Sequence, residues 1–422
     1  MIDDKLERKK EIFKSSVINN SNKMLRRIDA LSGKPESIEP FIDVLKRTFV
    51  DLRDVKRPRK FKETFGVFCV MVPEEMIYAA NAIPVKLCSG IFSGAQVGED
   101  FTPRDACPLV KASIGVTSMD AIPIYKNCSK FIVPTSCDCK KKMAYDISKF
   151  KPVIPIHVPS SRYDDTFVNN FVKDLYKFKN TLEYITRNQI NYNSLKESFR
   201  MIARAQIETY KLIEMQKRIP AVIKGSHVIT VMNAYAYEHV NGWTDDLCIL
   251  NKELEDKVKY NEFVARENSP RILFAGSPVV FPNLKIPVLI EESGGILAAD
   301  ETCLGTRRLY DPVAITDDSL SGLMRALAVR YLMPCTCPTF VQNKQRLFRI
   351  KQMVDDHKID GIIYHVLRGC QVYDFEYNLV EDEMKKYDIP VLRVETDYNE
   401  EDIEQLRIRL EAFIEMIKYK EI

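Results

Sequence analysis

The sequence predicts an α/β protein with two parallel-sheet domains, a helical insert between them and a helical arm before them. Short apolar runs alternate with helix-like segments in two stretches of the chain, which is typical of parallel sheets covered by helices. A long stretch between them carries apolar residues three to four positions apart and no strand signal. The chain has 422 residues, which is longer than a domain with a single hydrophobic core usually is. We expect a helical arm at 1–60, a first α/β domain at 61–160, a helical segment at 161–268 and a second α/β domain at 269–422.

The first α/β domain is predicted from the order of its apolar runs. TFGVFCVMV reads as a buried strand, and PEEMIYAANA as a helix with proline in its first turn. Cys69 falls inside that strand, so we expect it to pack in the core. The remaining segments predict strands at 83–88, 130–136 and 153–159, and helices that begin near 107 and 139.

The second α/β domain repeats this alternation after the helical segment. RILFAG predicts a strand, and the pair of glycines in ESGGIL is read as a helix end in preference to a phosphate-binding turn. The acidic residues that open the last helix suit the positive end of its dipole. Further strands are predicted at 295–300, 358–367 and 389–398, and helices at 319–333, 374–388 and 399–419.

Composition narrows the function classes. The apolar fraction is 45% and the charged fraction 29%, both ordinary for a soluble globular protein. A net charge of +3 gives no electrostatic case for nucleic acid. The N-terminus has no apolar signal region, and no apolar run reaches the roughly 20 residues of a membrane helix. We therefore expect a cytoplasmic protein without a membrane partner.

The chain has eleven cysteines, and three of them fall at predicted strand ends or helix starts. These are Cys107, Cys137 and Cys370. Ligands of open parallel sheets bind at the carboxyl ends of strands, where helix N-termini favour anions and thiolates. An iron–sulfur cluster held by three thiolates fits this arrangement and leaves one iron open for substrate. Core packing is an equally weighted alternative for each of the three.

A second group of cysteines lies in the other half. Cys303 follows the strand GILAAD, and Cys335 and Cys337 form PCTCP between two helices. Thiols two residues apart on an extended chain are about 6.6 Å apart, which suits ligands on different irons. Cys128 and Cys248 are expected to be structural, whereas Cys88 ends a strand near the presumed cleft. The chain has no CxxC pair, HExxH pair or phosphate-binding loop, so neither a zinc site nor a nucleotide site is predicted.

Four motifs carry a resemblance to a known family: CPLVKASIG, TSCDCKKK, RGCQVYDFE and the ending IPVLRVETDYNEEDIEQLRIRLEAFIEMI. From about residue 60 onward the chain resembles the 2-hydroxyacyl-CoA dehydratase and benzoyl-CoA reductase superfamily. The resemblance implies two flavodoxin-like domains and a [4Fe-4S] cluster bound by Cys107, Cys137 and Cys370. It also places Glu74 and Glu75 at the family's acidic positions near the cluster, as candidate catalytic residues.

ETCLG together with PCTCP resembles one branch of this superfamily, the double-cubane cluster proteins. That resemblance implies an [8Fe-9S] double cubane, a homodimer, and electrons supplied by a separate ATP-hydrolysing [4Fe-4S] activator for the reduction of small molecules. For the second cubane we choose Cys303, Cys335 and Cys337, with Cys69, Cys88 and Cys139 as further candidates. The alternatives are a dehydratase subunit with a single [4Fe-4S] cluster, and an electron carrier or cluster-storage protein. The sequence does not distinguish an acyl-CoA substrate from a small inorganic one.

The lysines 140–142 can offset the negative charge of a thiolate-bound cluster. For two of the three, a solvated helix face is at least as good an explanation.

Overall fold

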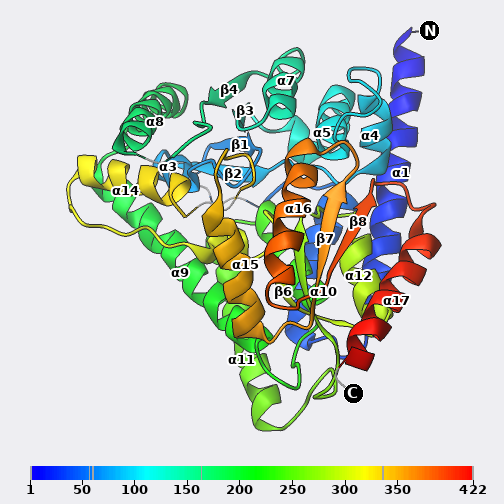
Figure 1. Cartoon of the computed structure of the whole chain (residues 1–422). Coiled ribbons are helices and arrows are strands. Elements are labelled where there is room, and N and C mark those ends of the chain that lie inside the picture. Colours follow the sequence, from blue (N-terminus) through cyan, green and yellow to red (C-terminus); the bar gives the residue numbers. More distant parts are fainter. Residues whose placement is uncertain (1, 57, 59–60, 163, 335–336, 421–422) are drawn as a thin grey trace.

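The computed structural model describes residues 2–56, 58, 61–162, 164–334 and 337–420. Its strands form two four-stranded parallel sheets with helices packed around them (Figure 1). The predicted α/β class with two parallel sheets is confirmed. The first sheet holds β1 (Glu63–Val67), β2 (Ala82–Lys86), β3 (Lys130–Pro134) and β4 (Val153–Ile156), and the second β5 (Arg271–Gly276), β6 (Ile296–Asp300), β7 (Gly361–Leu367) and β8 (Val391–Thr396).

The two sheets have the same strand order. The order is β2-β1-β3-β4 in the first sheet and β6-β5-β7-β8 in the second, which corresponds to the first four strands of the flavodoxin-like order. In such sheets the strand order changes direction between the first and third strands of each unit, so the connections from these two strands run to opposite sides. A crevice opens there at the carboxyl ends of the strands. Residues that follow β1, β3, β5 and β7 therefore lie where ligands bind in this class of fold.

Four strands are fully buried, the edge strands β2 and β6 among them, because both faces of each sheet are covered. Every residue of β2, β5, β6 and β7 is buried, as expected for parallel strands between helical layers. The helices of the first half are α3 (Glu74–Ala79), α4 (Phe92–Gly98), α5 (Pro108–Met119), α6 (Pro123–Lys126) and α7 (Asp138–Ile147).

The predicted helical segment consists of helices in the described residues. Asp164 caps α8 by accepting from the Thr166 N–H at 2.8 Å, and Asn191 and Ser194 form a capping box at the start of α9. The segment contains α8 (Asp165–Thr186), α9 (Tyr192–Gln216), α10 (Gly225–Ala234), the 3₁₀ turn η2 (Tyr235–Tyr237) and α11 (Val240–Lys259).

The second half and the N-terminal arm share one buried apolar core. That core runs from Phe13 in the arm through Trp243 of the helical segment to Phe413 in the last helix. In Figure 1 the first helix, in blue, lies beside the last, in red. The arm holds α1 (Ile2–Ala30), η1 (Glu36–Ile38) and α2 (Glu39–Phe49), and the second half α12 (Lys285–Glu292), α13 (Arg307–Tyr310), α14 (Leu320–Leu332), α15 (Lys344–His357), α16 (Gln371–Lys385) and α17 (Ile403–Lys420). The three boundaries between the four predicted segments stay predictions.

Several predicted strands run past their observed ends, as 83–88 does beyond β2 (Ala82–Lys86), and one such error misplaces a cysteine. TFGVFCVMV was expected to be a strand throughout, but β1 ends at Val67, so placing Cys69 inside a strand is wrong. Cys69 has a φ of 87°. This left-handed backbone conformation is rare outside glycine and differs from the extended conformation of a strand. Cys69 therefore lies just past the carboxyl end of β1. None of the helices in the described chain has the length and apolar character needed to cross a bilayer.

Candidate functional site

Three cysteines of the predicted cluster site occupy equivalent positions. Cys107, Cys137 and Cys370 are the N-cap residues of α5, α7 and α16. Two of them also follow strands at the switch points, Cys137 after β3 and Cys370 after β7. Exposed N–H groups and the positive end of the helix dipole favour negative charge at each position. The prediction that these three residues lie at the starts of helices is thus confirmed.

Close backbone packing brings the two halves together at Cys107 and Cys370. Gly369 has a φ of 77°, and a Cβ there would lie 2.0 Å from the carbonyl oxygen of Asp105. The loop before Cys370 therefore needs glycine in order to touch the loop before Cys107. The two thiols interact by a hydrogen bond, which lowers the pKa of Cys107 and, together with burial, raises that of Cys370.

Cys69 lies beside a cation. Its thiol accepts a hydrogen bond from Lys140, in the first turn of α7. Burial acts to raise the pKa of Cys69, but the Lys140 ammonium, the Met71 N–H and the Arg307 charge together outweigh burial, and the pKa is lowered. Burial would lower the pKa of Lys140, yet three neighbouring thiols raise it; they belong to Cys69, Cys88 and Cys137.

The three predicted lysines differ in their surroundings. Lys140 is half-buried among the thiols, whereas Lys141 and Lys142 are exposed. Lys141 contacts Asp138 one turn back at 3.0 Å, an ordinary solvated pair of the kind that contributes little. One of the three lysines therefore acts on the thiols, and the other two match the solvated-face interpretation.

Cys88 and Cys139 complete this group of thiols. Cys88 follows β2 and is buried, and burial raises its pKa to about 11. Cys139 is half-buried in the first turn of α7; burial raises its pKa, and the charges of Cys137 and Cys370 add to the effect. By contrast Cys128 donates to the Ile124 carbonyl at 3.1 Å, and Cys248 lies on α11 next to Arg204. We define the first thiol group as Cys69, Cys88, Cys107, Cys137, Cys139 and Cys370.

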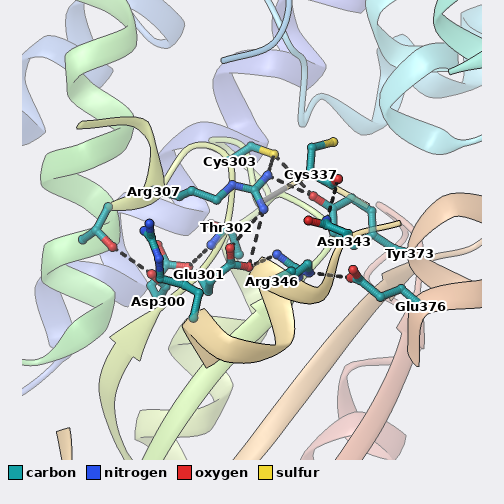
Figure 2. A network of polar contacts seen from close by, with 12 residues as sticks. Asp300, Glu301, Thr302, Cys303, Arg307, Cys337, Asn343, Arg346, Tyr373 and Glu376 are labelled. Carbon is teal, nitrogen blue, oxygen red and sulfur yellow. Dashed lines mark hydrogen bonds and ion pairs between the residues drawn. The ribbon is translucent and has the colours of Figure 1, made fainter. Parts of the chain in front are cut away.

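The second thiol group lies at the end of β6 (Figure 2). Arg307 donates a hydrogen bond from Nη2 to the Cys303 sulfur, and the Tyr373 hydroxyl lies 3.4 Å from the same atom. Cys337 is partly buried in the segment between α14 and α15, and its charge acts on Arg307 and Tyr373. Cys335, the third predicted member, lies outside the described residues.

The two groups are close enough to influence each other. The Cys303 charge acts on Cys88, and the charge of Arg307, which contacts Cys303, acts on Cys69. These thiols come from both sheets, so the carboxyl ends of the two sheets face one region. In the described part of the chain no three His, Cys, Asp or Glu side chains are placed to hold one metal ion together. Ligands of an iron–sulfur cluster bind different irons and need not meet at one point, and a set of thiols is the donor chemistry that such clusters take.

Glu74 and Glu75 begin α3 beside this region and are both buried. Glu74 pairs with Lys86 at 2.6 Å and Arg308 at 3.2 Å, and accepts from the Tyr235 hydroxyl at 3.0 Å. Lys86 in turn donates to the carbonyl of Cys69 at 3.3 Å. The acidic pair is thus connected to the backbone of the first thiol group.

Glu75 is in a different environment from its neighbour. It accepts a hydrogen bond from Tyr331 at 2.7 Å, and burial raises its pKa despite the nearby Arg330. The two carboxylates line a cavity of about 10 Å³, enough for one water molecule. A carboxyl group that holds its proton more tightly, next to a water-sized cavity, can act as a proton donor.

The fold combines two flavodoxin-like parallel sheets with thiols gathered near their carboxyl ends, and thiols are the donor groups that iron–sulfur clusters take. Residues 69–417 match the family model of the 2-hydroxyglutaryl-CoA dehydratase D-component, and the chain belongs to this family. This confirms the superfamily resemblance read from the sequence motifs.

Relatives match along most of the chain. "Putative dehydratase subunit YjiM" of Escherichia coli is 28% identical over 91% of this chain and 98% of its own. The beta subunit of (R)-2-hydroxyglutaryl-CoA dehydratase from Acidaminococcus fermentans is 22% identical over 84% and 93%. A benzoyl-CoA reductase subunit from Thauera aromatica is 20% identical over 88% and 95%. These relatives are named as subunits of dehydratases and reductases, so an enzymatic role is supported.

Several residues of the site were not predicted. Arg307, Tyr373, Lys86 and Arg308 reach it from segments far apart in the sequence. No local spacing marks them, because their partners are set by the packing of the two halves. For Lys140 the signal was present, as one lysine in a run of three.

Proposed function

We propose that this protein is an iron–sulfur reductase that binds a double cubane and receives low-potential electrons from a separate ATP-hydrolysing activator. The observation that carries the proposal is the pair of thiol groups in one region, each with its own cation. Lys140 contacts the first group and Arg307 the second. A single [4Fe-4S] cluster bound by Cys107, Cys137 and Cys370 would not require the second group.

In this proposal the two halves hold different parts of the cofactor. Cys107, Cys137 and Cys370 are the ligands of one cubane. Cys303, Cys335 and Cys337 are those of the other, and Cys69, Cys88 and Cys139 remain candidates for it. The bound cluster supplies one-electron chemistry at low potential.

The side chains around the thiols have separate tasks. Lys140 and Arg307 offset the negative charge of the thiolates, which lowers the cost of gathering them. Glu75 holds a proton at its carboxyl beside the cavity and gives it to the substrate as an electron arrives. Glu74 holds Lys86 and Arg308 in place by ion pairs, and its negative charge partly offsets their positive charges beside the thiols. The cavity next to the two carboxyls has room for one water molecule, so the small-molecule substrate of this proposal follows from the resemblance to the double-cubane proteins.

A second candidate is favoured by the names of the relatives. Two of those described above are named as dehydratase subunits, and a subunit of this kind would bind one [4Fe-4S] cluster and work with a second, different chain. The two candidates differ in iron content and in the partner that they need. The reductase is expected to be a homodimer, which presents matching surfaces to a symmetric activator.

The ATP requirement tests the reductase proposal. The sequence contains no phosphate-binding loop, so ATP is expected to act through the activator alone. Purified chain, activator, a strong reductant and a small reducible substrate are mixed with and without ATP. The proposal predicts turnover only when activator and ATP are both present, and no ATP hydrolysis by the chain alone. Equal turnover without ATP would exclude the coupled mechanism.

A further inference from the structure

The sulfur of Cys303 is held by two side chains from different elements. Arg307 in α13 donates to it from Nη2, and the Tyr373 hydroxyl in the first turn of α16 lies 3.4 Å away. The same Nη2 also donates to the Tyr373 oxygen at 3.2 Å. Sulfur, guanidinium and hydroxyl therefore form a closed triangle (Figure 2).

The directions of these hydrogen bonds follow from the groups involved. A guanidinium has donors and no acceptor, so the Tyr373 oxygen accepts from Arg307. The single hydroxyl hydrogen is then left to point at the Cys303 sulfur. Cys303 thus receives two donors, one of them charged, and such charge-assisted hydrogen bonds are the strong ones.

The triangle is anchored by a buried chain of ion pairs. Glu301 accepts from Arg307 at 3.2 Å and also pairs with Arg346, which pairs with Glu376 at 2.5 Å. Tyr364 donates to Glu376 at 2.7 Å at the far end of this chain. Arg346 has no exposed side-chain surface, and Arg307 only 5%. The guanidinium of Arg307 is therefore fixed in place before any ligand binds.

We propose that Arg307 and Tyr373 are positioning residues that orient the Cys303 thiolate as a ligand and raise the reduction potential of the cubane it binds. The inference rests on the proposed double-cubane function. A reduced cluster carries more negative charge than an oxidised one, so donors aimed at a ligand sulfur stabilise the reduced form. The cation beside the first thiol group is an ammonium, whereas the cation beside the second is a rigid, planar guanidinium. The two cubanes therefore have different surroundings.

The test compares two tyrosines of the same network. Tyr373→Phe removes the hydroxyl that contacts sulfur. Tyr364→Phe is the matched control, because it removes a buried hydroxyl from the far end of the same chain. The anaerobically purified variants are titrated with a reductant of known potential and followed by electron paramagnetic resonance. At a fixed ambient potential, Tyr373→Phe is expected to lower the ratio of reduced to oxidised cluster about fivefold, the size of one ordinary hydrogen bond.

Arg307→Lys is a second variant that keeps the positive charge and loses the planar fork. It is expected to lower the ratio in the same direction as Tyr373→Phe, whereas Tyr364→Phe leaves it at the wild-type value. A Tyr373→Phe protein with full iron and an unchanged potential would overturn the inference, as would an equal shift in Tyr364→Phe. Failure of the proposed function is distinguishable, because it appears as about four irons per wild-type chain, one cubane's worth, before any variant is made.

Discussion

Replacing Cys370 with alanine is expected to remove about half or more of the bound iron, because it deletes one of the three thiolate ligands proposed for the first cubane. Cys370 caps α16 and touches Cys107 from the opposite half of the molecule. Iron and acid-labile sulfide are measured per chain after anaerobic purification. The substitution is expected to abolish reductase activity as well.

Cys248→Ala is the matched control for this variant. Cys248 is a partly buried thiol on α11 whose sulfur lies 3.8 Å from Arg204, and no cofactor role is proposed for it. The control is expected to keep its full iron content. An equal iron content in Cys370→Ala and Cys248→Ala would contradict the assignment of Cys370 as a ligand.

Replacing Lys140 with methionine has the second largest expected effect. The substitution keeps most of the side-chain volume but removes the charge that lies among Cys69, Cys88 and Cys137. Those thiolates then repel one another without compensation in a partly buried site. Loss of groups that support metal ligands typically costs 10-fold to 100-fold in affinity, so we expect the cluster to be lost to an iron chelator about tenfold faster.

Lys141→Met is the neighbouring control, because Lys141 is exposed and pairs only with Asp138 among the described contacts. It is expected to release iron at the wild-type rate. If both variants lose iron equally fast, the effect belongs to the net charge of α7 and not to the position of Lys140. Iron release is followed by the visible absorbance of the cluster.

Much of the fold could be predicted from the sequence, since its signals are local. Buried parallel strands appear as short apolar runs, and helices as segments of 3.6-residue period. The positions of Cys137 and Cys370 followed from the same reasoning, because the residue after a strand and before a helix must lie at the sheet edge. Gly294, with a φ of 89° just after α12, agrees with the predicted helix end at ESGGIL.

The parts that could not be predicted depend on contacts across the fold. An apolar run does not reveal where a strand ends inside it, so Cys69 was placed in β1 when it lies beyond Val67. Arg307 and Tyr373 meet at Cys303 only because α13 and α16 pack over the same sheet edge. Such a pairing has no fixed spacing in the sequence.

The iron content of the chain tests the central claim most directly. The protein is purified without oxygen, and iron, zinc and acid-labile sulfide are counted per chain. The double-cubane proposal predicts about eight irons, two cubanes' worth, with broad visible absorbance. About four irons in a fully active preparation would contradict the double cubane and favour the dehydratase subunit. Zinc in place of iron, with no visible absorbance, would contradict both.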